Sequence, residues 1–311
     1  MASVSKVSTS FLFDSATERM SSLQKRLATT QSQMAEGKQV LSPSDAPDKA
    51  AAIQRLNGEL ERQNNYISSL QVALHRYQGE ETALRSANDV LTRMKELSLQ
   101  ATNGTQGKVE HDAIATEMQA LRDQLVSLGN TRDDSGNYLF SGTRVNTPAF
   151  ATAADGSVVY QGDQTLTKIP AGVERQVAYS RSGTDVFSRV IRDENGQSVA
   201  VGFFDAIDQM IAGIKAGDGT AMQKSVSDLD QMLSNLSVSL ARTGSDQSVV
   251  QSQIDMLSET KLRVQSTLSD VQDLDYTTAV TQMNKEQMAL QAAMSSFAKI
   301  SGMSLFDYIK G

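Results

Sequence analysis

The chain has 311 residues, of which 39% are hydrophobic and 5% aromatic, with a net charge of −7 and no cysteine. Disulfides, thiolate zinc sites and cysteine nucleophiles are therefore excluded, and no basic face indicates a nucleic-acid or membrane partner. No apolar run near the start has the length of a signal-peptide core, and none approaches the roughly 20 residues of a membrane span.

Apolar side chains at alternating steps of three and four predict a first helix with a heptad stripe. The stripe consists of Phe13, Ala16, Met20, Leu23, Leu27, Thr30 and Met34. Gly37 predicts the helix end, because glycine tolerates the left-handed position after a last turn. Two prolines in residues 42–48 break the helix, and Asp45 is the expected cap of the next one, with Pro47 in its first turn.

A much longer helix is expected to follow and to run to about Thr102. Its stripe consists of Ile53, Leu56, Leu60, Ile67, Leu70, Leu74, Tyr77, Leu84, Leu91 and Met94. Roughly fifty helical residues span about 75 Å, which is longer than one globular core needs, so the pattern predicts a rod. A shorter helix at 114–128 is expected to pack back against it.

Residues 131–202 have a different character, with short β-prone runs between turn signals. The turn signals are Asp134-Ser135-Gly136-Asn137 and Asp155-Gly156. The runs are Tyr138-Leu139-Phe140, Val158-Val159-Tyr160, Thr165 to Ile169 and Gln176-Val177-Ala178-Tyr179. This segment is predicted to be a small β-rich insert.

Helix is expected again from Phe203, with a short helix ending near Gly217 and long helices from there to the C-terminus. Thr243-Gly244-Ser245-Asp246 is a candidate break. Asp275 is the expected cap of the last helix, which begins near Tyr276. The stripe of that helix includes Val280, Met283, Leu290, Met294 and Phe297.

The order of helices, insert and helices predicts a mainly α fold. We expect an elongated rod of long antiparallel helices from both chain ends, with a small β-rich inserted domain. Three regions are expected: 1–45 with 275–311 as terminal helices that pair as a coiled coil and order mainly on assembly, 46–130 with 203–274 as a helical rod, and 131–202 as the insert.

The polar residues do not indicate an enzyme. His75 and His111 lack a neighbouring nucleophile signature and are predicted to be solvated or packed. Asp270, Asp273 and Asp275 are close in sequence but lack an EF-type glycine loop, so a helix end explains them better than a metal site. No cofactor or metal site is predicted.

Several segments nevertheless resemble the flagellin family of the bacterial flagellum. They are Lys6-Val7-Ser8-Thr9, residues 34–47, residues 91–105 and residues 273–279. Within the family, other segments are similar to its hook-associated members. They are residues 138–150, 159–163 and 183–187 and an ending that contains Leu305, Phe306 and Tyr308.

The resemblance implies a structural subunit that joins hook to filament in the extracellular flagellum. Its implied partners are the first hook-associated protein, flagellin, further copies in a ring, and an export chaperone on the C-terminal helices. Export through the flagellar type III apparatus without a cleaved signal is also implied. The expected assembly seam is Phe13, Met20, Leu23, Leu27, Met34, Val280, Met283, Leu290, Met294 and Phe297.

Two other functions remain open at this point. The chain could itself be a flagellin, although the small insert and the ending with Phe306 and Tyr308 argue against that. Heptads alone would also allow a cytoplasmic coiled-coil adaptor.

Overall fold

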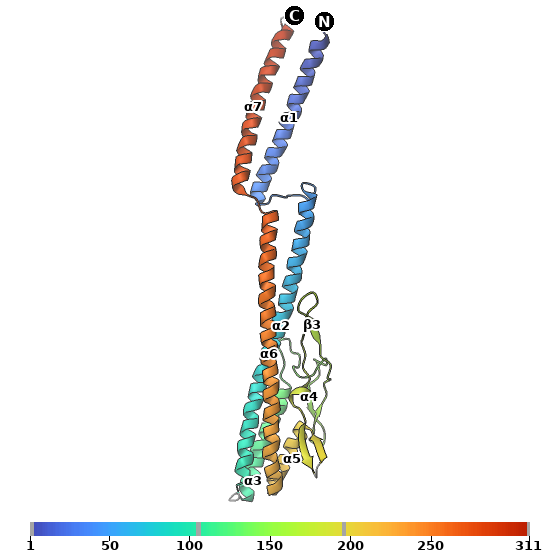
Figure 1. Ribbon diagram of the computed structural model, residues 1–311, viewed down its shortest axis with the longest axis vertical. Helices are drawn as coiled ribbons and strands as arrows, with labels where there is room; N and C mark the ends of the chain where they lie inside the picture. Colours follow the sequence, from blue (N-terminus) through green and yellow to red (C-terminus); the bar gives the residue numbers. More distant parts are fainter. Residues whose placement is uncertain (1–2, 104–106, 195–196, 310–311) are drawn as a thin grey trace. The chain divides into compact units, whose positions relative to one another are not determined.

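The computed structural model describes residues 3–103, 107–194 and 197–309, with side chains described at 11, 13–103, 107–193 and 197–299. The chain forms two compact units (Figure 1). The first combines both chain ends, Met1–Arg62 and Thr260–Gly311, and the second is the continuous stretch Gln63–Glu259. Long helices at both ends and a small insert of short antiparallel strands confirm the predicted fold class. The three-region division stays a prediction.

In the first unit, α1 (Ser3–Glu36) and α7 (Tyr276–Ile309) lie side by side and run antiparallel (Figure 1). The predicted end of α1 is confirmed, because Gly37 follows it with φ 69°. The predicted cap of α7 is also confirmed: the carboxylate of Asp275 accepts hydrogen bonds from the backbone N–H of Thr277 at 2.9 Å and of Thr278 at 3.3 Å.

Hydrogen bonds tie Gly37 and Gln39, which follow α1, to residues 271–274, which precede α7. The N–H of Gln39 donates to the carbonyl of Gln272 at 2.9 Å, and the N–H of Leu274 donates to the carbonyl of Gly37 at 2.9 Å. The side-chain amide of Gln39 donates to the carbonyl of Val271 at 2.6 Å. These bonds satisfy backbone groups that the helix ends leave free and fix where the two terminal helices start to pair.

Helix α2 (Pro47–Ala101) begins at the second proline, as predicted. The predicted cap is wrong. The carboxylate of Asp45 accepts instead from the N–H of Ser42 at 2.9 Å, and the N–H of Asp45 donates to the carbonyl of Ser42 at 3.0 Å. This closed turn precedes the helix and uses the carboxylate that the first turn of α2 would need.

The second unit is built from α3 (Lys108–Gly129), α5 (Phe203–Ala216) and the parts of α2 and α6 (Gly219–Gln272) that belong to it. Gly217 ends α5 as predicted, with φ 69°. The candidate break at 243–246 is wrong, because α6 is continuous there. Glycine in a helix costs only about 1 kcal/mol, and the fully buried Thr243 donates its hydroxyl to the carbonyl of Ser239 at 3.1 Å.

The insert contains three two-stranded antiparallel hairpins and one short helix. Its elements are β1 (Phe150–Thr152), β2 (Val158–Tyr160), β3 (Lys168–Pro170), β4 (Gln176–Ala178), α4 (Gly183–Val186), β5 (Val190–Glu194) and β6 (Gln197–Val201). Consecutive strands pair, with registers Phe150↔Tyr160, Lys168↔Ala178 and Val190↔Val201. The β-prone run at 138–140 is not a strand: Tyr138 makes an isolated bridge with Arg132, and Leu139 and Phe140 lie buried in turns.

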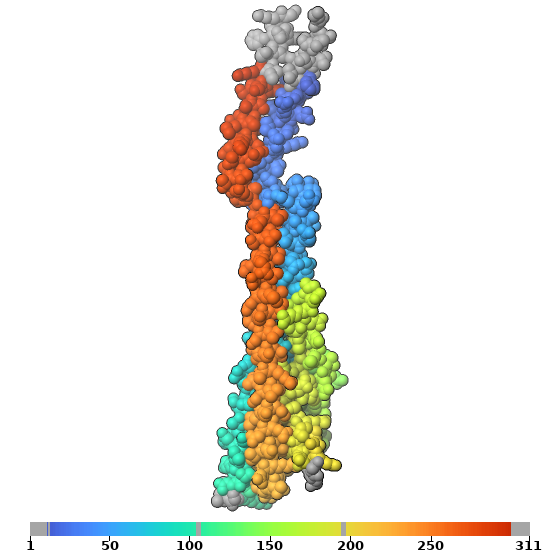
Figure 2. Space-filling model, viewed as in Figure 1, coloured from blue at the N-terminus to red at the C-terminus, as the bar shows by residue number. Residues whose placement is uncertain are grey.

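Two apolar clusters bind the insert to the helices of the second unit, along which it lies in Figure 2. The larger cluster contains an aromatic group with ring centroids 5.2–6.0 Å apart. This group consists of Phe140, Phe150, Phe187, Phe203 and Phe204. The smaller cluster packs Val177 and Ala171 of the insert against Leu70 of α2 and Val250 of α6. The second unit therefore has a closed core of its own.

Candidate assembly surface

The facing sides of α1 and α7 carry two rows of residues spaced by sevens. The large-residue row consists of Phe13, Met20, Leu27 and Met34 on α1, and Tyr276, Met283, Leu290 and Phe297 on α7. The mixed row consists of Ala16, Leu23 and Thr30 on α1, and Ala279, Glu286 and Ala293 on α7. The pairing is visible where the rings of Phe13 and Phe297 lie with centroids 4.6 Å apart. These rows are the a and d positions of a two-helix coiled coil.

The predicted seam residues occupy two different environments. Seven are half-buried in the pair: Met20, Leu23, Leu27, Met34, Met283, Leu290 and Phe297. Phe13 contacts Phe297 and remains 41% exposed. Val280 and Met294 belong to neither row and are 40% and 55% exposed. The side chains of Leu305, Phe306 and Tyr308 lie outside the described residues.

The most deeply buried side chains of the pair are small or polar. Thr30 is 7% exposed and Glu286 is 5% exposed. The hydroxyl of Thr30 donates to one carboxylate oxygen of Glu286 at 3.0 Å, and the amide of Gln282 donates to the other at 2.8 Å. The predicted stripe of α1 includes Thr30, but the predicted stripe of α7 omits Glu286 because glutamate is not apolar. Glu286 nevertheless lies seven residues from both Ala279 and Ala293.

Much of the apolar surface of the pair stays open. Within the two rows, Phe13 and Tyr276 are exposed, and outside the rows the exposed large hydrophobic side chains of the pair are Phe11, Val280, Met288 and Met294. Two helices can cover only one face of each other, so much of the surface of these side chains stays in contact with water in the pair. An apolar surface of this kind is typical of helices that pack against further helices in an assembly.

The acidic residues before α7 act in local turns. Hydrogen bonds from Thr278 lower the pKa of Asp275, which is the N-cap, and Asp273 accepts from the hydroxyl of Ser269. Among the described side chains, no group of three or more His, Asp or Glu is arranged to hold a metal ion. No helix in the described part of the chain combines the length and apolarity needed to cross a bilayer.

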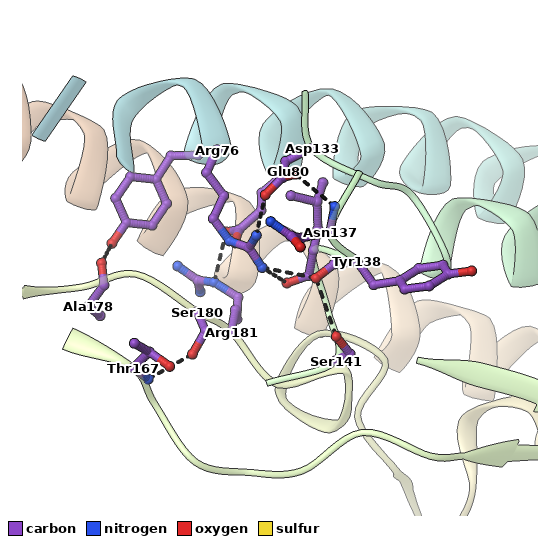
Figure 3. A network of polar contacts seen from close by, with 12 residues as sticks. Arg76, Glu80, Asp133, Asn137, Tyr138, Ser141, Thr167, Ala178, Ser180 and Arg181 are labelled. Atoms are coloured by element: carbon purple, nitrogen blue, oxygen red, sulfur yellow. Dashed lines mark hydrogen bonds and ion pairs between the residues drawn. The ribbon is translucent and has the colours of Figure 1, made fainter. Parts of the chain in front are cut away.

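A buried ionic network anchors the insert in the second unit (Figure 3). Arg76 of α2 is almost fully buried and donates to the carboxylate of Asp133 at 2.8 Å, and to the carbonyls of Tyr138 at 3.0 Å and Leu139 at 2.8 Å. Glu80, one turn further along α2, accepts from Arg181 at 3.2 Å. We call these residues, with Asp246 of α6, the anchor network.

The anchor network links four separate segments of the second unit. The guanidinium of Arg181 also donates to Asp246 of α6 at 2.8 Å, so this one insert residue reaches both long helices. Tyr77 donates its hydroxyl to the carbonyl of Ala178, and burial raises the pKa of that hydroxyl. Loop, insert and helices are thereby held in one arrangement.

Glu80 is the strained member of this network. Its side chain is fully buried, and one carboxylate oxygen has no hydrogen-bond partner. Burial raises the pKa of Glu80 to about 7, and the two arginines oppose that shift only in part. The desolvation of the carboxylate therefore outweighs its ion pairs.

An open groove of about 1170 Å³ lies in the second unit, lined by α3, α5 and the strand hairpins. Its buried Arg122 donates to Asp208 at 2.9 and 3.0 Å and to the carbonyl of Gly156 at 2.7 Å, which ties α3 to α5 and to a hairpin turn. Neither histidine lines it: His75 is exposed, and His111 lies 3.3 Å from the carbonyl of Ala101. The hydrogen bonds of Arg122 hold α3, α5 and the hairpin turn together.

Comparison with known proteins places these features in a family. Residues 7–145 match the bacterial flagellin N-terminal helical region, and residues 226–309 match the bacterial flagellin C-terminal helical region. Flagellar hook-associated protein 3 of Escherichia coli strain K12 is 26% identical over 89% of this chain and 91% of its own length. The protein of that name from Salmonella typhimurium strain LT2 is 24% identical over 97% and 99%.

The fold is also found in a solved structure. The crystal structure of flagellar hook-associated protein 3 from Legionella pneumophila gives a TM-score of 0.64 at 16% identity, covering 70% of this chain and 98% of that one. Flagellins are more distant: polar flagellin A of Vibrio parahaemolyticus matches over 82% of this chain. The match to the Salmonella typhimurium protein covers 97% of this chain, which is more than the flagellin match covers.

Proposed function

The chain belongs to the flagellin family, and from this premise we propose that it is a structural subunit that joins the hook of the bacterial flagellum to the filament. The observation that carries the proposal is the nearly full-length match to proteins named flagellar hook-associated protein 3. The flagellin alternative has less support because flagellins match over less of the chain. Relatives that are structural flagellar proteins also argue against a cytoplasmic adaptor or an enzyme.

The physical basis of joining is lateral packing of the terminal helices. The open apolar side chains of α1 and α7 are not covered within the chain, and neighbouring subunits would cover them in a tube. Axial assembly is head to tail, so each subunit presents different surfaces to its two neighbours. One end would bind the first hook-associated protein, the other would bind flagellin, and copies of the chain would form a ring.

Assembly outside the cell requires delivery. We propose that the chain leaves through the flagellar type III apparatus with an uncleaved N-terminal signal, and that a cytoplasmic chaperone binds the C-terminal helices before export. The open apolar surface of α7 supports this, because such a surface exposed in the cytoplasm is an aggregation hazard. Ordering of the terminal helices mainly on assembly is part of the same proposal.

Deletion of the gene tests the junction role. We expect bare hooks and secreted, unpolymerised flagellin, with filaments restored by the parent gene. Disappearance of the filament protein itself would identify the chain as a flagellin instead. Antibody labelling of purified hook–filament structures is the second arm: a signal at the junction supports the proposal, and a protein confined to the cytosol would refute it.

A further inference from the structure

The heptad spacing of α1 and α7 leaves the register of the pair undetermined by apolar contacts alone. Both rows repeat every seven residues, so sliding α1 by seven places Phe13 opposite Leu290 instead of Phe297. Large apolar residues would still meet large apolar residues along the row. A repeating stripe of this kind permits slipped pairings unless a different kind of contact distinguishes them.

The mixed row supplies that contact at one position. In the observed register the hydroxyl of Thr30 donates to Glu286 at 3.0 Å, and both side chains are buried. After the seven-residue slip, Leu23 would take the place of Thr30, and after the opposite slip Gly37 would take it. Neither residue has a side-chain donor for the carboxylate.

A buried carboxylate makes such a mismatch costly. Glu286 receives one hydrogen bond from Thr30 and one from Gln282, and Gln282 is on its own helix and moves with it. Loss of the Thr30 bond would therefore leave half of the carboxylate unsatisfied in a buried position. A single buried polar residue in a heptad stripe is known to fix coiled-coil register in this way at some loss of stability.

We propose that Thr30 and Glu286 select the register in which the two chain ends pair, in addition to the backbone hydrogen bonds of Gly37 and Gln39 where the pair begins. They act as positioning residues: the large-residue row supplies attraction, and the polar pair selects one alignment. The consequence for assembly rests on the proposed junction function, because a slipped pair would present α1 and α7 to neighbouring subunits shifted by two helical turns.

The absence of cysteine from the chain gives a direct test. Full-length protein with Phe13→Cys and Phe297→Cys reports the observed register by disulfide trapping, and protein with Phe13→Cys and Leu290→Cys reports the slipped one. Oxidation traps each pairing whenever it forms. In the parent background we expect the observed register to be trapped at least about tenfold faster than the slipped one.

Four further substitutions separate a register role from simple packing. Glu286→Leu and Thr30→Leu should each lower the ratio of observed to slipped trapping by about tenfold, because neither register then has a satisfied carboxylate that the other lacks. Glu286→Gln and Thr30→Ser keep the hydrogen bond and should leave the ratio within about threefold of the parent. Leucine keeps comparable bulk at both positions but cannot make the hydrogen bond, so a lowered ratio in the leucine variants alone identifies the hydrogen bond as the cause.

Each result of the trapping experiment either supports or overturns the proposed register role. A lowered ratio in both leucine variants with rescue by Gln and Ser supports the proposal. An unchanged ratio in the leucine variants, a ratio lowered equally in all four, or equal trapping of both registers in the parent overturns it. None of these results depends on the flagellum, so the register role can fail while the gene deletion still gives bare hooks, and the reverse.

Discussion

The pair formed by α1 and α7 differs from the second unit in how its side chains are buried. The second unit encloses a cluster of five phenylalanines and a buried ionic network, so its stability depends on contacts within one chain. The terminal pair leaves Phe11, Val280, Met288 and Met294 exposed, and no side chain of its large-residue row is fully buried. From this difference we propose that one part is complete in the monomer and that the other gains most of its burial from neighbouring subunits.

The substitution with the largest expected effect on assembly is Leu290→Asp. It places a carboxylate in the large-residue row, where burial in the assembled tube would leave it without a partner. We expect loss of incorporation and of motility, measured by swimming assays and by labelling of the junction. Thr281→Asp, at an exposed position of the same helix, is the control and should remain motile. Normal swimming of the Leu290→Asp strain would remove the row from the account.

The aromatic residues of the two regions give a matched pair. Phe150→Ala should lower the free energy of unfolding of the second unit by about 3–5 kcal/mol, because it empties a buried aromatic site. Phe13→Ala removes a partly exposed ring from the first unit. It should lower the free energy of unfolding of the free chain by less than about 1 kcal/mol. Urea unfolding followed by circular dichroism measures both. Similar losses for the two variants would contradict a difference in burial.

A buried and an exposed arginine of α2 together test whether the anchor network contributes to stability. Arg76→Ala leaves buried carbonyls and Asp133 without their donor, and should cost about 3 kcal/mol of stability. Arg85→Ala on the same helix removes only an exposed pair with Glu81 and should cost no more than about 0.5 kcal/mol. Equal unfolding midpoints for Arg76→Ala and the parent would show that the network is not an anchor.

Glu80 predicts a pH dependence confined to the second unit. Its folded-state pKa, about 7, lies above its ordinary value of 4.5, so the folded chain binds more protons between these values. The contribution is therefore fully present below about pH 4.5 and is lost as the pH rises through 7. Relative to Glu80→Gln, the parent should lose about 1–3 kcal/mol between pH 5 and pH 8.

Urea midpoints of the parent and of Glu80→Gln at the two pH values provide the measurement. The uncharged amide has no proton to lose, so the two proteins should be closest in stability at pH 5. Parallel pH profiles would mean that Glu80 stays ionised throughout, and that its ion pairs outweigh its burial.

Three helix ends were predictable from sequence because residues next to them decide where the helix ends. Gly37, Gly217 and Asp275 act within a few residues of the end they define, and each is confirmed. The Asp45 cap failed because its carboxylate closes a local turn with Ser42, and the break at 243–246 failed because more distant contacts decide there. Gly244 lies inside α6 because burial of its neighbour Thr243 in the second unit outweighs the helix cost of glycine.

Sequence patterns could not predict the polar contacts, because the residues that make them are far apart along the chain. Thr30 and Glu286 are 256 positions apart, and Glu80 and Arg181 are 101 positions apart. Heptad spacing identified the helix faces but could not pair them, and it did not separate the row residues from Val280 and Met294, which lie outside the two rows and are exposed in the single chain. A carboxylate at a stripe position, such as Glu286, is the one local signal that a search for apolar residues discards.

Hydrogen exchange of the free chain, followed by mass spectrometry, tests the central claim most directly when it is repeated on purified hook–filament structures. We expect α1 and α7 to exchange orders of magnitude faster than the core helices of the second unit in the free chain, and to become protected in the assembled structure. Terminal helices as protected in solution as the phenylalanine cluster, with no further gain on assembly, would contradict the account.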